Sequence, residues 1–171
     1  MREDHPQGGP EPRVPMSGSA DWPDLQVQPA TIRMIRGVLR LERICFQEDA
    51  WPWVDVASIL LWPSVVRLGA VDGPQLIGFV AGDTRWRPRT GMIATLAVHP
   101  SYRRRGVGRR LLAECEARLE APLVRLTVRL DNLAAIALYE SAGYQRRETL
   151  EGYYSRGVAG LLMEKVRNGS A

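Results

Sequence analysis

Apolar and polar residues recur along this chain with two different spacings, close to two residues in some segments and close to 3.6 in others. Alternating or continuously apolar segments predict strands at 25–28, 65–71, 75–85, 91–98, 123–130, 144–154 and 160–166. Segments with helical spacing predict helices at 32–46, 52–62, 107–119 and 132–143. This order of elements predicts an α/β (α+β) fold with a mixed sheet.

Residues that cap, break or turn the chain set the expected boundaries of these elements. They are Thr31, Pro52, Pro63, Asp72 with Gly73, Pro122, Asp131 or Asn132, and Gly143. In the first helix the apolar spacing places Ile32, Ile35, Leu39 and Phe46 near one face. The segment "GMIATLAV" is almost continuously apolar, which predicts a central strand covered on both faces.

The chain of 171 residues is long enough for one domain with its own core. Residues 1–22 are rich in Pro, Gly and Ser, which predicts a disordered tail, followed by a single domain at 23–167 and a short tail at 168–171. No apolar run is long enough for a membrane span, and the first residues lack the apolar centre of a signal peptide. We therefore expect a cytoplasmic protein without a membrane partner.

The charge and cysteine content narrows the choice of partner. The net charge is +4, which favours an anionic partner, and of the 23 basic residues only Lys165 is not arginine. The two cysteines, Cys45 and Cys115, do not form a CxxC pair, and there are only two histidines. We expect buried free thiols and no metal site.

Five arginines surround two glycines in the segment "VHPSYRRRGVGRRLL", residues 98–112. Gly106 and Gly108 lie where a strand turns into a helix, so the first amides of that helix are exposed at the positive end of its dipole. The segment lacks both a P-loop pattern and GxGxxG. Spacing alone leaves a phosphate-binding turn and a solvated charged loop open. No nucleic-acid partner is expected, because no recognition-helix motif or aromatic platform accompanies these arginines.

The same segment resembles the acetyl-coenzyme A signature of the GNAT superfamily of N-acetyltransferases, [RQ]-x-x-G-x-[GA], through Arg103, Gly106 and Gly108. "IATLAVHP" and "LDNLAAIALYESAGY" are similar to the family's central strand and second conserved block, and the resemblance covers residues 24–167. "LQVQPAT", "LRLERICF" and "GYY" resemble the RimI-type ribosomal-protein N-terminal acetyltransferases. The resemblance implies the GNAT fold, a mostly antiparallel sheet of about 6–7 strands flanked by about 4 helices and splayed between the fourth and fifth strands.

The resemblance also implies an activity. The protein is expected to be an enzyme that transfers an acetyl group from acetyl-coenzyme A, its co-substrate, directly to an amine, with a protein N-terminal α-amine as the preferred acceptor. A small-molecule amine acceptor and a non-catalytic acyl-coenzyme A-binding module are the alternatives. Either a monomer or a homodimer is compatible with the sequence.

Site residues follow from the matching motif positions. The strand at Leu96–Val98 is implied to pair with the pantetheine arm, and the amides from Arg103 to Arg109 are implied to hold the pyrophosphate. Tyr139 matches the acid that protonates the departing thiolate, although its pattern alone also fits a core aromatic residue. The complete cofactor-binding set is Leu96, Ala97, Val98, Arg103, Arg104, Arg105, Gly106, Val107, Gly108, Arg109, Asn132 and Tyr139.

The sequence departs from the RimI-type pattern at Thr127, where that subgroup carries a glutamate base twelve residues before the tyrosine. Threonine cannot act as a general base near neutral pH. A water relay, another side chain or the absence of a dedicated base remain open, and the other candidates are His99, Asp83 and Glu151.

Two aromatic pairs have open roles. Tyr153 and Tyr154 either line an acceptor groove or pack on the sheet edge, and Trp51 and Trp53 either shape the acceptor site or fill the core.

Overall fold

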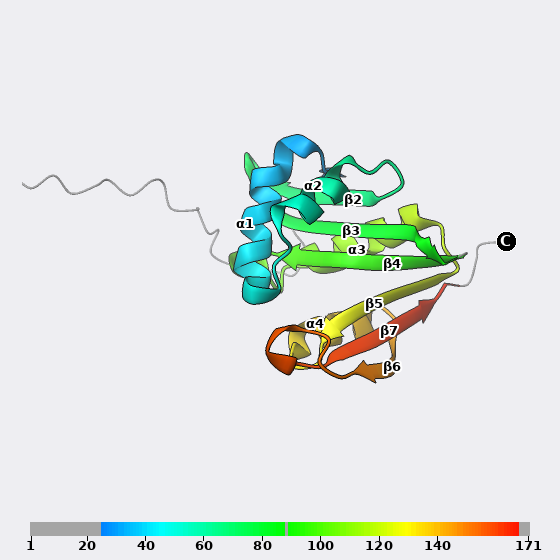
Figure 1. Ribbon diagram of the computed structural model, residues 1–171. Coiled ribbons are helices and arrows are strands. Elements are labelled where there is room, and N and C mark those ends of the chain that lie inside the picture. The colour runs from blue at the N-terminus through cyan, green and yellow to red at the C-terminus, as the bar shows by residue number, and fades with distance from the viewer. Residues whose placement is uncertain (1–24, 88, 168–171) are drawn as a thin grey trace, which may run out of the picture.

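Seven strands form one sheet, in the order β1-β2-β3-β4-β5-β7-β6, in the computed structural model, which describes residues 25–87 and 89–167 (Figure 1). The strands are β1 (Gln26–Pro29), β2 (Val66–Asp72), β3 (Gln75–Arg87), β4 (Thr90–Val98), β5 (Leu123–Arg129), β6 (Gln145–Leu150) and β7 (Gly160–Val166). Neighbouring strands are antiparallel except for the parallel pair β4 and β5, which confirms the predicted mixed sheet. The predicted tails at 1–22 and 168–171 lie outside the described residues.

Four α-helices cover the two faces of the sheet. They are α1 (Ile35–Phe46), α2 (Trp53–Leu61), α3 (Val107–Leu119) and α4 (Leu133–Ser141), and they are accompanied by the short 3-10 turns η1 (Ile32–Met34), η2 (Gln47–Asp49), η3 (Pro100–Tyr102) and η4 (Ser155–Gly157). Buried residues of α1 and α2 form one apolar cluster with the sheet, and those of α3 and α4 form a second. In Figure 1, α1 and α2 lie in front of the sheet and α3 and α4 behind it.

The predicted face of the first helix is confirmed in part, because Ile35, Leu39 and Phe46 pack against the core. Val38, Leu41 and Glu42 are the buried residues of α1, whereas Ile32 is 41% exposed. The chain also enters the helix through η1, and the side chain of Thr31 makes no cap hydrogen bond. The apolar spacing did not single out Glu42, because a hydrophobicity pattern gives no signal for a buried carboxylate.

Most of the other boundaries were close to prediction. The Asn132 side chain caps α4 by accepting a hydrogen bond from the Ala135 amide at 3.2 Å. The hairpin turn lies one residue later than expected, because Asp72 pairs with Gln75 as the last residue of β2. Helix α3 ends at Leu119 with Glu120 in the left-handed region (φ 50°), so Pro122 does not stop it.

The sheet opens between β4 and β5. Their parallel ladder joins Thr90–Ile93 to Leu123–Leu126 and stops there, so among the described residues 94–98 of β4 have no partner in β5. On the other edge of β4, Ala81 faces Thr95 and Gly82 faces Ile93, which leaves Ala94 as the extra residue of a β-bulge. A bulge bends its strand, so the splay predicted between the fourth and fifth strands is confirmed at this point (Figure 1).

A buried carboxylate supports the free half of β4. Glu42 of α1 is 1% exposed. Its carboxylate accepts a hydrogen bond from the Thr95 hydroxyl at 2.9 Å and one from the Trp51 amide at 3.4 Å. Burial raises the pKa of Glu42, and these two hydrogen bonds offset only part of the effect. Glu42 therefore joins α1, β4 and the segment before α2 at the position where the sheet opens.

We predict that Glu42→Gln changes the pH dependence of stability. The native pKa of Glu42 is raised above its ordinary value of 4.5, so protonated Glu42 stabilises the folded state. This contribution is present in full below pH 4.5 and is lost as the pH rises through the native pKa. Glutamine cannot ionise, so the Tm of the unsubstituted protein should fall relative to that of Glu42→Gln between about pH 5 and pH 8. Thermal unfolding of both proteins across this range measures the difference, and parallel Tm curves would contradict the buried position of the carboxyl group.

Candidate functional site

The turn between β4 and α3 exposes the first amides of the helix. After η3 the chain passes through Arg104 and Gly106, both in the left-handed region (φ 59° and 78°), and Gly106 is the N-cap of α3. The amide of Arg110 is bonded to the Gly106 carbonyl at 3.0 Å, as expected for the second turn of the helix. The preceding amides, from Val107 to Arg109, have no carbonyl partner within a helix. An N-terminus of this kind favours an anion.

Gly108 allows α3 to start close to its neighbours. A Cβ atom at this position would lie 3.2 Å from Leu138 of α4 and 3.5 Å from Val98 of β4. The missing side chain therefore lets the first turn of α3 approach both α4 and the end of β4. This close approach is consistent with the small residue, glycine or alanine, that the motif has here.

The arginines of the turn make different contacts. The Arg103 Nε donates to the Val98 carbonyl at 3.1 Å, the Arg105 guanidinium lies 5.8 Å from the centre of the Tyr102 ring, and Arg109 donates to the Ser141 hydroxyl at 3.3 Å. Arg104 is exposed. The fold thus gathers the predicted residues from Arg103 to Arg109 around one helix N-terminus.

His99 begins this turn as the sequence suggested. Its Nδ1 accepts a hydrogen bond from the Ser101 amide at 3.4 Å. Partial burial and the nearby charges of Arg40 and Arg103 lower the pKa of His99. The imidazole therefore has a structural role in the turn and does not line the pocket described below.

Tyr139 lies on the same side of the sheet as α3. It is 7% exposed and packs edge-to-face on Tyr144 with ring centres 5.8 Å apart. Burial, and to a smaller extent the nearby Tyr154, raise the pKa of Tyr139, and none of the described residues forms a hydrogen bond with its hydroxyl. Leu96 and Val98 of β4 pack against the apolar cluster that contains Tyr139, whereas Ala97 belongs to the cluster on the opposite face. A protonated phenol therefore lies in the cluster that borders the free half of β4.

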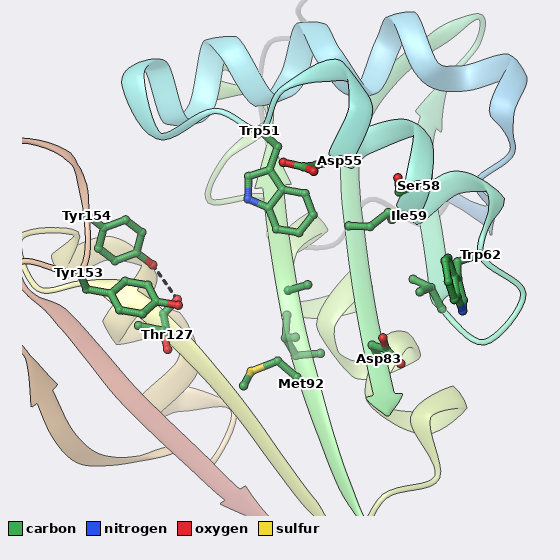
Figure 2. Close-up of a pocket in the computed structure, with 13 residues that line it drawn as sticks. Trp51, Asp55, Ser58, Ile59, Trp62, Asp83, Met92, Thr127, Tyr153 and Tyr154 are labelled. Carbon is green, nitrogen blue, oxygen red and sulfur yellow. Dashed lines mark hydrogen bonds between the residues drawn. The ribbon is translucent and has the colours of Figure 1, made fainter. Parts of the chain in front are cut away.

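A pocket of about 490 Å³ lies on the opposite face of the sheet, beneath α2 (Figure 2). Trp51 on one side and Tyr153 and Tyr154 on the other border its opening, while Met92 and Thr127 lie deeper on the strands. Two carboxylates, Asp55 and Asp83, belong to the lining, and none of the described lining residues is an arginine or a lysine. The pocket therefore suits an acceptor that carries a positive charge.

The expected base position is Thr127, and it lies in this pocket. Its backbone carbonyl accepts a hydrogen bond from the Tyr154 hydroxyl at 2.9 Å, which Figure 2 marks with a dashed line. Burial raises the pKa of Tyr154 to about 12, with a further effect from Tyr153. Of the alternative bases, Asp83 lines the pocket, whereas Glu151 lies in an exposed turn outside it.

The structure locates both aromatic pairs, and Trp51 also packs against the apolar cluster beneath α1 and α2. Tyr153 and Tyr154 line the pocket, and so does Trp51, whereas Trp53 is 66% exposed and neither lines the pocket nor fills the core. Sequence reasoning missed Asp55 and Glu42. Asp55 is an ordinary acid in the first turn of a helix by its sequence position, and the apolar spacing did not single out Glu42.

Charged residues join the two loops beside the pocket opening. Asp49 of η2 pairs with Arg129 at the end of β5, and it accepts a hydrogen bond from the Ser155 amide of η4 at 2.9 Å. Arg156 of η4 donates its Nε to Glu48 of η2 at 2.6 Å. We call these five residues the loop clasp. It connects the segment just before Trp51 with the segment just after Tyr154.

Arg129 is the central residue of the loop clasp. Besides Asp49 it pairs with Asp131 at 2.9 Å, and its guanidinium lies 5.7 Å from the centre of the Tyr154 ring. Partial burial alone would raise the pKa of Asp49, but the hydrogen bonds from Ser155 and Arg129 outweigh it and lower the pKa. Arg129 and Asp49 therefore both stay ionised at neutral pH.

The described residues contain neither a metal-like cluster nor a disulfide. No group of three His, Cys, Asp or Glu side chains in 25–87 and 89–167 is arranged to hold a metal ion. Cys45 is half-buried and Cys115 is buried, and both are free thiols. Within the same ranges every helix is too short or too polar to cross a membrane.

Comparison with known proteins identifies the family. The model of the acetyltransferase (GNAT) family matches residues 35–144. The N-alpha-acetyltransferase RimI of Mycobacterium tuberculosis is 38% identical over 109 residues, which cover 63% of this chain and 69% of the relative.

Two solved structures share the fold. The ribosomal-protein-S18-alanine N-acetyltransferase of Escherichia coli superposes with a TM-score of 0.75 at 23% identity, over 85% of this chain and 97% of that one. Arabidopsis thaliana NAA60 in complex with acetyl-CoA superposes with a TM-score of 0.73 at 21% identity, over 85% and 99% of the two chains. The strand order and the splay therefore agree with the family match, and the chain belongs to the acetyltransferase (GNAT) family, as an N-acetyltransferase that uses acetyl-coenzyme A.

Proposed function

We propose that this protein transfers the acetyl group of acetyl-coenzyme A directly to the N-terminal α-amine of a protein, in the cytoplasm. The observation that carries the proposal is the opening between β4 and β5, which has the anion-binding turn and Tyr139 on one face of the sheet and the acidic pocket on the other. Donor and acceptor can then approach from opposite faces and react at the free half of β4. The named activity of the Mycobacterium tuberculosis relative supports the choice of acceptor.

The cofactor is assigned to the α3 side. The amides from Arg103 to Arg109 would hold its pyrophosphate, because they surround a helix N-terminus with nearby guanidinium groups. Backbone groups of Leu96–Val98 would pair with the pantetheine arm, since β5 leaves that edge of β4 free. Asn132 combines its observed capping role with a contact to the cofactor.

Tyr139 is assigned as the acid for the departing thiolate. A thiol has an ordinary pKa of about 8.5, so its thiolate leaves more readily when a protonated group is near. Burial keeps the Tyr139 phenol protonated, and its hydroxyl is not engaged by any described residue. The side chain is thus suited to donate a hydrogen bond or a proton.

The absence of a base at Thr127 favours an α-amine over a lysine. An α-amine has a pKa of about 7.7–8, so on the order of 10% is neutral at pH 7, against less than about 0.1% of a lysine side chain. An α-amine acceptor can therefore react without a strong base. Asp55 would attract the ammonium form of the acceptor into the pocket before it loses its proton.

We predict that Tyr139→Phe lowers kcat by about 100-fold or more and leaves the Kd for acetyl-coenzyme A within about twofold, because only the acid is removed. Steady-state assays give kcat, and calorimetry gives the Kd. Turnover at the level of the unsubstituted enzyme would show that another group protonates the thiolate.

An acetylation screen tests the acceptor. We expect acetylation of N-terminal peptides at pH 7, and rates at least about tenfold lower for peptides with a blocked N-terminus and an internal lysine, in line with the neutral fractions of the two amines. Mass spectrometry locates the acetyl group. A preference for small amines would move the protein to the small-molecule class, and cofactor binding without any acetylation would make it a binding module.

The loop clasp should affect the acceptor side only. In Arg129→Met, Asp49 loses its charged partner while its side chain is only 13% exposed. A mostly buried carboxylate without its partner is unfavourable, so we expect both loops to loosen and the KM for the peptide to rise by about tenfold. The KM for acetyl-coenzyme A should change by less than about twofold. Arg156→Gln is the matched control, because its ion pair with Glu48 is exposed and such pairs contribute little. Equal effects of both substitutions, or a loss of cofactor affinity, would contradict this role.

A further inference from the structure

A group of buried polar side chains lies next to Tyr139. Glu116 of α3 is 5% exposed, and its carboxylate accepts a hydrogen bond from the Tyr144 hydroxyl at 2.8 Å and one from the Lys165 ammonium at 2.6 Å. These three residues, which we call the Glu116 network, come from α3, from the turn between α4 and β6, and from β7. Tyr144 belongs to the same apolar cluster as Tyr139, so the network reaches into the core beside the proposed acid.

Tyr144 connects the Glu116 network to Tyr139 through both its ring and its backbone. The two rings pack edge-to-face with an interplanar angle of 63°, and the Tyr144 amide donates a hydrogen bond to the Tyr139 carbonyl at 3.0 Å. An aromatic pair has a preferred mutual orientation, so the direction of one ring depends on that of the other. Because the Tyr144 hydroxyl is bonded to Glu116, Tyr139 packs against a ring whose own direction is fixed.

Lys165 contacts Tyr144 as well as Glu116. Its Nζ lies 5.7 Å from the centre of the Tyr144 ring, so one ammonium group acts on the ring as a cation and on the carboxylate as a hydrogen-bond donor. Lys165 is also the only lysine among the 23 basic residues of the chain. A guanidinium group is planar and larger, so an arginine would need more room between the carboxylate and the ring than the compact ammonium does.

Stability alone is a weak reason for a charged network at this place. The cluster that contains Tyr139 and Tyr144 is built from apolar residues such as Leu126 and Met163. Taking two charges out of water costs free energy that their attraction offsets only in good geometry, and apolar side chains of similar volume often give equal stability. What a fully bonded polar network adds is a single arrangement of its members. Here that arrangement fixes Tyr144, and through it Tyr139.

We propose that Tyr144, held in place by Glu116 and Lys165, is a positioning residue that directs the Tyr139 hydroxyl toward the departing thiolate. The inference rests on the proposed role of Tyr139 as the acid. In that step the thioester C–S bond breaks as the bond between the amine nitrogen and the acetyl carbon forms, and the phenol proton passes to the sulfur. The phenolate then regains a proton from water, which takes up the proton that the amine releases. A misplacement of about 1 Å can cost about 100-fold in rate, so a fixed ring direction matters.

A double-mutant cycle tests the proposal. Tyr144→Phe keeps the ring that packs on Tyr139 and removes the hydrogen bond to Glu116. We expect kcat to fall by at least about tenfold, while the KM for the acceptor peptide and the Kd for acetyl-coenzyme A stay within about twofold. In the Tyr139→Phe background the same substitution should lower kcat by less than about twofold, because the hydroxyl that it misdirects is already absent.

Two further variants complete the test. Lys165→Met removes the ammonium group and should also give a loss of kcat that depends on the Tyr139 hydroxyl; it decides the question if Tyr144→Phe does not fold. Tyr102→Phe is the matched control, because Tyr102 is likewise 5% exposed and donates its hydroxyl to a carboxylate, that of Asp72, at 3.0 Å. Any change in kcat that the control causes should be equal with and without the Tyr139 hydroxyl.

The possible results separate the positioning role from the acid itself. A loss of kcat in Tyr144→Phe that is equal in both backgrounds would show a purely structural role, and an unchanged kcat would show no role. Either result overturns the positioning proposal and leaves the assignment of Tyr139 untouched. Full turnover in Tyr139→Phe alone would instead refute the acid, and the positioning role with it. The Tm of every variant, measured in parallel, shows whether it is folded.

Discussion

The parallel pairing of β4 and β5 over only four residues is the constraint on which the rest of this structure depends. The bulge at Ala94 bends β4 away, and the outer half of the strand keeps β3 as its partner while none of the described strands pairs with its other edge. An unpaired strand edge in the middle of a sheet is costly unless something pairs with it. The features on either side of the opening, the turn into α3 and the pocket beneath α2, are arranged around this one edge.

Two further interactions hold the opening in shape, and both connect parts of the chain that are distant in sequence. Glu42 joins α1 to Thr95 on the free half of β4 and to the Trp51 amide. The loop clasp joins η2 to η4 through Asp49 and Arg129. Because Trp51 and Tyr154 lie next to these contacts, the walls of the pocket are fixed by buried or half-buried polar pairs and not by apolar packing alone.

Local signals in the sequence predicted the order of strands and helices along the chain, and the resemblance to the GNAT family implied the splay between the fourth and fifth strands. Period-two segments located the strands, and Arg103, Gly106 and Gly108 located the turn. The sequence did not predict Glu42, whose burial is determined by contacts with Thr95 and Trp51 that no local pattern contains. It also missed the loop clasp, since ion pairing depends on tertiary neighbours. Thr127, Asp83 and Asp55 come from three separate elements and line one pocket, which a linear pattern cannot show.

Amide hydrogen exchange of β4, with and without acetyl-coenzyme A, tests the central claim most directly. If the pantetheine arm pairs with the free edge of the strand, saturating cofactor should slow exchange in Leu96–Val98 and in the first turn of α3 by at least about tenfold, while β1 and β2, on the far side of the sheet, remain unchanged. Cofactor binding that leaves exchange in Leu96–Val98 unaltered would contradict the account, because the opening between β4 and β5 would then not be the place where the donor binds.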